Sequence, residues 1–189
     1  MVNIKTFDQF INESENLNEG FNIKNWIKKP EIKEFMIDAE LAKQLADLDS
    51  EIEWRERELG YGLWDLAAQY GGDAYDDNRE PNQEWFDQKK KDLATDKKKL
   101  DKERKKVMKK IISKHPYVAG VEEFLEDSYM SLATTKIKKI NAGMKSVEIV
   151  SWDMYDKVNR KDVEAYDITI EQLIAIILSF RAVKEEIKY

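Results

Sequence analysis

The sequence predicts a mostly α-helical protein with an antiparallel, coiled-coil-like helical hairpin and a compact α-rich C-terminal part that holds a small β element. Three observations predict this fold class. Charged residues make up 37% of the chain and only three residues are proline, a balance typical of long helices. Two long segments carry apolar residues at seven-residue intervals. Because these two segments have opposite net charge, we expect them to fold back on each other.

The first hairpin helix is predicted from about Glu31 and carries the acidic charge. Between Asp38 and Glu58 there are eight acidic residues and three basic ones. Gly60 and Gly62 lower helix stability, so we expect the helix to kink or pause there. The apolar residues that recur every seven positions are Leu45, Ile52, Leu59 and Leu66.

A polar loop from Gly71 to Asn82 separates the two predicted helices. Asp73 and Glu84 are eleven positions apart, the spacing of the first and last ligands of an EF-hand calcium loop. Tyr75 and Asn78, however, stand where that loop needs an oxygen ligand and a glycine. We therefore expect a solvated turn, with no metal and no cofactor.

The second hairpin helix is strongly basic. Residues 87–110 hold twelve Lys or Arg residues and five acidic ones, and the simpler interpretation is a solvated face that packs beside the acidic helix. The alternative is nonspecific contact with DNA phosphates. A single arginine, and no aromatic residue after Phe86, argue against the reading of bases. Its apolar seam is Phe86, Leu93, Leu100 and Val107, and the candidate DNA contacts are Lys89, Lys90, Lys97, Lys98 and Lys105.

The C-terminal part begins where Pro116 ends the basic helix. Helical spacing of apolar residues follows over 118–132. Ser146 to Trp152 largely alternates apolar with polar residues and predicts a strand, whose mate is Thr134 to Ile140 in a hairpin around 141–143.

The last helix is predicted to start at Thr169, where Gln172 completes a capping box. Residues 168–180 are apolar nearly all round, so this helix should be buried, and it is too short to cross a bilayer. We divide the chain into an N-terminal segment (1–20), a linker with the helical hairpin (21–114) and the C-terminal part (115–189).

Catalytic motifs are not found in the sequence. The chain has no cysteine, and its one histidine, His115, has no partner at an informative spacing. Trp152, Asp153 and Tyr155 form the one mixed polar and aromatic cluster that could line a pocket. We predict no catalytic residue, no enzyme activity and no membrane partner, because no stretch approaches the roughly 18 apolar residues of a membrane span.

The N-terminal segment has the pattern of a short amphipathic helix. Ile4, Phe7, Phe10 and Ile11 recur at spacings of three and four, and Thr6 is a suitable N-cap. A polar stretch with Gly20 follows, so the segment should extend from the fold or dock onto another surface. The alternative is an ordinary helix that packs on the domain.

IKTFDQFINES, followed by LNEG, resembles the capsid-targeting sequence of internal head proteins in large contractile-tailed phages of the T-even type. The resemblance covers about the first twenty residues. It implies that the protein is made in the host cytoplasm and packaged in the head interior of the virion. It also implies that the protein enters the cytoplasm of the next host on injection. It also implies prohead components and a host protein as binding partners. The residues that match the targeting sequence are Ile4, Lys5, Thr6, Phe7, Phe10 and Ile11.

In that family a prohead protease cuts after the glutamate of an apolar residue, any residue and Glu. Two such tripeptides are present, Ile11-Asn12-Glu13 and Leu17-Asn18-Glu19. The second is the better candidate because Gly20, the smallest residue, follows Glu19. The resemblance thus implies a mature chain that begins at Gly20.

The sequence leaves three functions open. The first is a head-packaged protein that acts by binding, and the second is a prohead scaffold or core protein that self-associates through the hairpin. The third is a stand-alone protein interaction module. A scaffold needs little packed core, so the apolar segment 168–180 favours the first function over the second.

Overall fold

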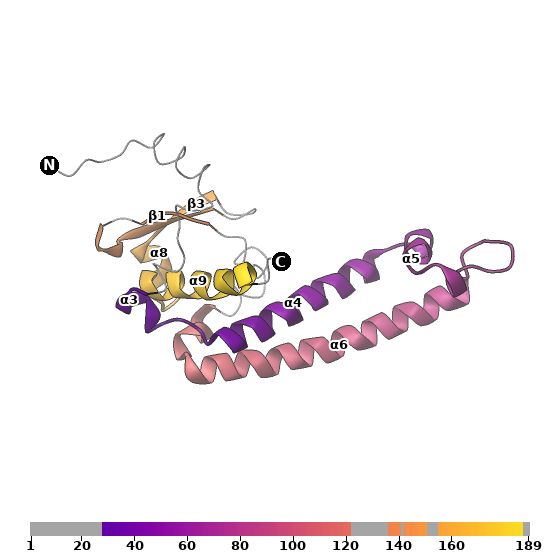
Figure 1. Cartoon of the computed structure of the whole chain (residues 1–189), viewed down its shortest axis with the longest axis horizontal. Helices are drawn as coiled ribbons and strands as arrows, with labels where there is room; N and C mark the ends of the chain where they lie inside the picture. The colour runs from indigo at the N-terminus through magenta and orange to yellow at the C-terminus, as the bar shows by residue number, and fades with distance from the viewer. Residues whose placement is uncertain (1–27, 122–135, 141, 151–154, 187–189) are drawn as a thin grey trace. The chain divides into compact units, whose positions relative to one another are not determined.

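This computed structural model of the chain describes residues 28–121, 136–140, 142–150 and 155–186 (Figure 1). Most of these residues are helical, which confirms the predicted fold class. The predicted targeting segment and both cleavage patterns lie outside the described residues, as do Trp152, Asp153 and residues 122–132 of the predicted helix 118–132.

The chain divides into two compact units. The hairpin unit is Glu40–Lys114, and the mixed unit combines the residues before it with His115–Tyr189. Helix α3 (Pro30–Lys33), which the sequence analysis groups with the hairpin, contacts α9 (Ile170–Glu186) and belongs to the mixed unit. The cause is Ile32, whose side chain is fully buried.

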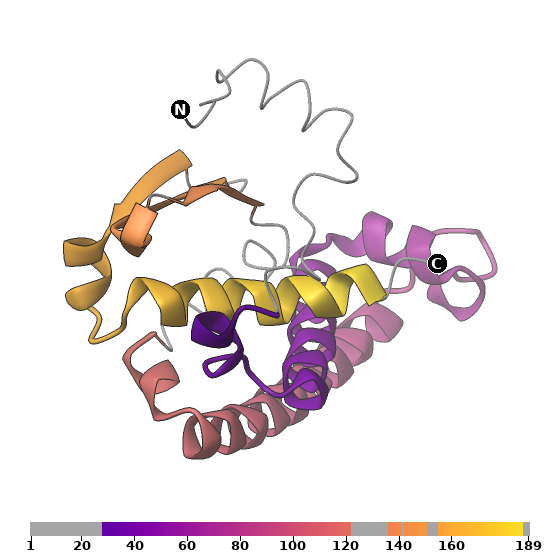
Figure 2. The same ribbon diagram turned by 60° about the vertical axis from the view of Figure 1, so that its left-hand side comes forward.

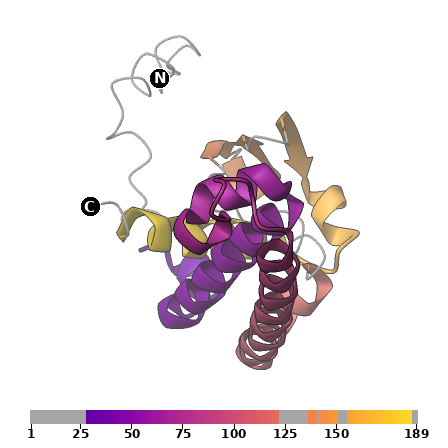
Figure 3. The ribbon, with the colours of Figure 1, turned by 90° about the vertical axis from the view of Figure 1, so that its right-hand side faces the viewer.

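Two long helices, α4 (Ala39–Gly60) and α6 (Gln83–Lys114), form the predicted hairpin and lie side by side in Figures 1 and 3. Helix α4 ends at Gly60 and α5 (Leu63–Tyr70) starts after Gly62, so the predicted interruption is confirmed. A short 3-10 helix, η1 (Gly72–Ala74), and a loop then lead to α6.

The apolar seam of the hairpin unit is only half buried. Four of its predicted residues are fully or nearly fully buried, namely Leu45, Leu66, Leu93 and Val107. The other four are only partly buried, namely Ile52, Leu59, Phe86 and Leu100. One apolar residue per heptad makes a thin seam, so polar contacts must help to hold α4 and α6 together.

The mixed unit contains a three-stranded antiparallel sheet in the order β1-β2-β3. Strands β1 (Lys136–Ile140) and β2 (Ser146–Val150) form the predicted hairpin, in which Ile137 pairs with Ile149. Their connection contains the 3-10 turn η3 (Ala142–Met144), where Gly143 adopts a φ of 69°. We did not predict β3 (Tyr155–Asn159), because its short sequence contains Asp and Asn, which are rare in strands.

Helix α9 is the core of the mixed unit, and Figures 1 and 2 show it running along the sheet. The predicted capping box is confirmed: Thr169 N–H donates to Gln172 Oε1 at 2.7 Å, and Gln172 N–H donates to Thr169 Oγ1 at 3.2 Å. No helix among the described residues is long and apolar enough to span a membrane. The buried side chains of α9 include Leu173, Ile174, Ile176, Ile177, Leu178, Phe180 and Val183.

Ser179 is the buried polar residue of α9, and both of its hydrogen-bonding roles are filled. Its hydroxyl accepts a hydrogen bond from Ile37 N–H at 2.9 Å and donates one to Ala175 O at 2.7 Å. The segment after α3 is therefore fixed to α9 by a backbone donor as well as by Ile32.

The 3-10 helix η2 (Pro116–Val121) is fixed by two close contacts. The Tyr117 hydroxyl donates to Phe35 O, and burial raises the pKa of Tyr117 to about 12. Gly120 lies so close to the turn after α8 (Arg160–Glu164) that a Cβ there would stand 2.4 Å from Tyr166 O. Only glycine fits at position 120 without displacement of backbone.

Candidate functional site

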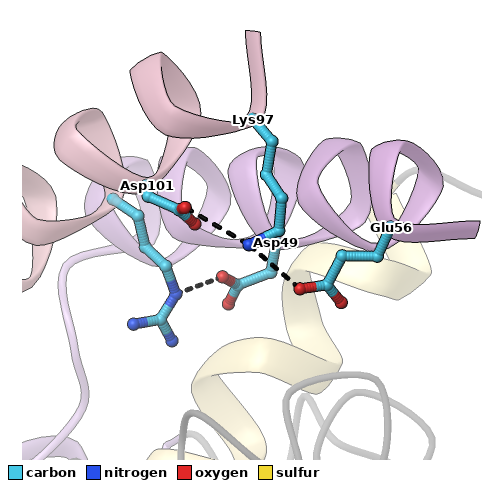
Figure 4. A network of polar contacts seen from close by, with 5 residues as sticks. Asp49, Glu56, Lys97 and Asp101 are labelled. Carbon is cyan, nitrogen blue, oxygen red and sulfur yellow. Dashed lines mark hydrogen bonds and ion pairs between the residues drawn. The ribbon is translucent and has the colours of Figure 1, made fainter. Parts of the chain in front are cut away.

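Ion pairs between α4 and α6 follow from the opposite charges of the two helices (Figure 4). Lys97 Nζ lies 3.1 Å from Glu56 Oε1 on α4 and 3.3 Å from Asp101 Oδ2 on its own helix. Arg104 Nε pairs with Asp49 Oδ1, and both of these side chains are about nine-tenths buried. The Glu56 and Asp101 carboxylates raise the pKa of Lys97. These side chains therefore serve the joint between the helices.

Lys90 closes the C-terminal end of α4. Its ammonium donates to three backbone carbonyl oxygens: Glu58 O at 3.2 Å, Leu59 O at 2.5 Å and Tyr61 O at 2.7 Å. The last carbonyls of a helix have no intrahelical donor and carry the negative end of its dipole, so a cation stabilises them. Loss of water around the ammonium lowers the pKa of Lys90.

Glu58 is a buried carboxylate at the same end of the hairpin, with a relative exposure of 1%. The Tyr70 hydroxyl donates to its Oε1 at 2.5 Å, and Arg55 Nη1 lies 2.9 Å from its Oε2. Loss of water around the phenol, together with the hydrogen bond to Glu58 and its negative charge, raises the pKa of Tyr70 to about 12. Both carboxylate oxygens thus have donors, as a buried charge requires.

The Tyr70 ring of this cluster contacts a cation and a second aromatic ring. Lys89 Nζ lies 3.8 Å from the centroid of the Tyr70 ring, a cation–π contact, and the Tyr70 and Trp85 rings are 5.8 Å apart. Trp54 on α4 and Trp64 on α5 have relative exposures of 42% and 58%. Aromatic residues are enriched in protein interfaces, so the surface that carries Trp54 and Trp64 is a candidate protein contact.

The five lysines that the sequence offers as candidate DNA contacts therefore fall into two groups. Lys89, Lys90 and Lys97 make the contacts described above within the hairpin unit. Lys98 and Lys105 are exposed. The structure does not bring the five together on one face.

A different set of lysines does share one face of α6. At 100° per residue, the residues between positions 91 and 109 that fall within about 40° of one line along the helix are five lysines and Thr95, and this line lies opposite the apolar seam. All five lysine side chains are exposed, and none makes an ion pair with a described residue. We call this set the lysine stripe: Lys91, Lys98, Lys102, Lys105 and Lys109.

In the loop after α5, the Asp76 carboxylate binds the backbone of the loop itself. Asp76 Oδ1 accepts hydrogen bonds from Asn78 N–H and Glu80 N–H, both at 2.9 Å, and Tyr75 pairs with Pro81 in an isolated β-bridge. Within residues 28–121 and the described segments that follow, no group of three or more His, Asp or Glu side chains could hold a metal ion.

His115 and Tyr155, the remaining sequence candidates, are placed in structural elements. The His115 ring contacts the Tyr117 ring edge-on, with centroids 5.9 Å apart. Tyr155 is the first residue of β3 and pairs with Val150. Comparison with known proteins gives no matching family, no matching curated sequence and no matching solved structure.

Proposed function

We propose that this protein is packaged in the head of a T-even-type phage through its N-terminal segment and that it acts by binding. The observation that carries the proposal is the resemblance of IKTFDQFINES and LNEG to the capsid-targeting sequence of internal head proteins. In this proposal its partners are prohead components during assembly and a host component after injection.

The folded part of the chain is compatible with cleavage after Glu19. The first described helix starts at Pro30, so a chain that begins at Gly20 keeps every described helix and strand. The mature protein would then keep the whole hairpin unit and every described residue of the mixed unit. Cleavage after Glu19 would therefore leave any binding surface on the described helices and strands unchanged.

A deletion experiment tests the targeting role. The full chain and a chain without residues 1–20 are produced in cells infected by a T-even-type phage, and their copies per purified head are measured. We expect the full chain inside the heads and the shortened chain to be depleted at least tenfold. Equal amounts of both chains, or neither chain, would contradict the proposal.

The exposure of Trp54 and Trp64 favours a second candidate, an interaction module that does not depend on packaging. The scaffold alternative uses the same hairpin, but its seam residues Leu93 and Val107 are already buried within the single chain. Sedimentation of the purified chain separates these alternatives, because a scaffold must self-associate and a module for another protein remains a monomer.

A further inference from the structure

We propose that the lysine stripe of α6 binds the phosphate backbone of duplex DNA without reading its sequence. This inference does not depend on the N-terminal segment or on packaging. It starts from the placement of five exposed lysines opposite the apolar seam, where they contribute nothing to the contact between α4 and α6.

The arrangement of charge on the stripe is unfavourable for the helix itself. Lys102 has four helix neighbours at spacings of three and four, and all are lysines: Lys98, Lys99, Lys105 and Lys106. Of these, only Lys99 has a carboxylate partner among the described residues, Asp96 at 3.1 Å. Like charges at these spacings destabilise a helix. A bound polyanion would offset this repulsion, because each lysine would then lie next to a negative charge.

Between Lys91 and Lys109 the acidic residues of α6 lie away from the centre line of the stripe, whereas Glu84 and Asp87 fall near that line before the stripe begins. Asp92, Asp96 and Glu103 are rotated from its centre line by about 100° or more. Asp101 is nearer, but its carboxylate is engaged by Lys97. A phosphate on the stripe would therefore meet lysines first, although the net charge of the whole chain is −6.

The composition of the stripe favours DNA phosphates over an acidic protein or an anionic membrane as its ligand. The centres of protein interfaces are depleted in lysine and enriched in aromatic residues, and the stripe has no aromatic residue. Binding in the plane of an anionic membrane requires an apolar face beside the charged one, but the apolar face of α6 is the buried seam. Lysine does bind phosphate well, as a point charge.

The length and shape of the stripe fit a duplex. Lys91 and Lys109 are separated by about 27 Å along the helix axis, or roughly eight base pairs of B-form DNA. The exposed half of α6 can lie along the major groove, whose width of about 12 Å matches the diameter of an α-helix. A single strand would need stacking aromatics, and the major groove of duplex RNA is too narrow for a helix.

The test compares two variants of the full chain with equal charge change. The stripe variant replaces Lys91, Lys98, Lys102, Lys105 and Lys109 with Gln, which preserves helix propensity. The control variant replaces five exposed lysines outside α6 with Gln: Lys33, Lys43, Lys145, Lys157 and Lys161. A pair variant, with Lys102→Gln and Lys105→Gln, is the smaller change if the stripe variant loses helicity by circular dichroism.

Binding is measured by fluorescence anisotropy with a labelled 20-base-pair duplex of random sequence, at several salt concentrations. We expect the stripe variant to bind about 30-fold more weakly than the unchanged chain at low salt, and the control variant to stay within about threefold. The plot of log K against log salt has a negative slope, and this slope should become shallower by roughly one for each phosphate contact removed. The pair variant should show an intermediate loss.

Four outcomes would overturn the proposal. The first is a stripe variant that binds the duplex within threefold of the unchanged chain, and the second is a control variant that loses as much. The third is tighter binding of the unchanged chain to single-stranded DNA or duplex RNA of equal length. The fourth is equal or tighter binding to polyglutamate or to vesicles of anionic lipid, which would assign the stripe to an acidic protein or a membrane.

Discussion

The Tyr70 hydroxyl lies 2.5 Å from Glu58 Oε1 and donates a hydrogen bond to this buried carboxylate. Replacement of Tyr70 with Phe removes the donor but keeps the ring that contacts Lys89 and Trp85. A buried acceptor without its donor costs about 1–3 kcal/mol, so we expect a loss of this size in the free energy of unfolding, measured in urea.

Tyr166 supplies the control for this change: both rings are partly exposed, at 41% for Tyr70 and 57% for Tyr166, but the Tyr166 hydroxyl makes no hydrogen bond with a described residue. Tyr166→Phe should change the free energy of unfolding by less than about 0.5 kcal/mol. The pKa of Tyr70 in the folded chain is about 12, above the ordinary tyrosine value of 10.0, so the folded state favours the protonated phenol. Its contribution to stability is therefore complete below pH 10 and is lost as the pH rises towards 12. A Tyr70→Phe variant as stable as the unchanged chain would contradict this account of Glu58.

Lys90→Met tests the closure of α4. The change keeps much of the side-chain length but leaves three carbonyl oxygens without their shared donor. We expect a loss of about 1–3 kcal/mol in the free energy of unfolding. Lys91→Met is the matched control, because Lys91 is the next residue and is exposed. Equal losses in the two variants would contradict a specific role of the three hydrogen bonds, because each change removes one positive charge from α6.

Gly120→Ala tests the close approach of η2 to the turn after α8. The new Cβ would lie 2.4 Å from Tyr166 O, so backbone must move, and we expect a loss of about 1–3 kcal/mol. Gly60→Ala is the control, because a Cβ at Gly60 meets no atom within 4 Å. That change should be neutral or stabilising by up to about 1 kcal/mol. Thermal unfolding of both variants measures these changes in stability. A Gly120→Ala variant as stable as the unchanged chain would contradict the close packing.

Lys102→Gln should stabilise the chain in the absence of any ligand. The change removes repulsion with four neighbouring lysines, each pair worth about 0.2–0.5 kcal/mol at low ionic strength. We therefore expect a gain of about 1 kcal/mol, which disappears at high salt because the charges are exposed. Thermal unfolding at low and high salt measures it. A lower stability at low salt would show that Lys102 has a favourable partner and would weaken the argument for the stripe.

The parts of the fold that were predictable from the sequence rest on local chemistry. Thr169 and Gln172 form a capping box that involves only neighbouring residues. Gly60 and Gly62 interrupt a helix because of their own backbone entropy. The β1–β2 hairpin follows from alternation and a glycine turn. Such signals lie within a few residues of the structure that they specify.

The parts that the sequence did not predict depend on distant contacts. Strand β3 is polar and short, and it forms because β2 provides its hydrogen-bonding partner. Helix α3 belongs to the mixed unit because Ile37 N–H reaches Ser179, 142 positions away in sequence. No local pattern contains these pairings.

For the basic helix, the position of each lysine relative to the apolar seam predicts which way its side chain points, and a count of lysines does not use this information. Phe86 and Leu93 belong to the seam, and the residues four positions later, Lys90 and Lys97, must lie on the same face. These two lysines therefore turn towards the hairpin and not towards a ligand. The same helical rotation places Lys102 and Lys109 opposite the seam.

The central claim, packaging with maturation, is tested most directly by the intact mass of the chain in purified phage heads. The account predicts a single species that begins at Gly20 and retains both folded units. A chain in the heads that still begins at Met1 or Val2 would contradict maturation after Glu19, and absence of the chain from the heads would contradict the packaging claim itself.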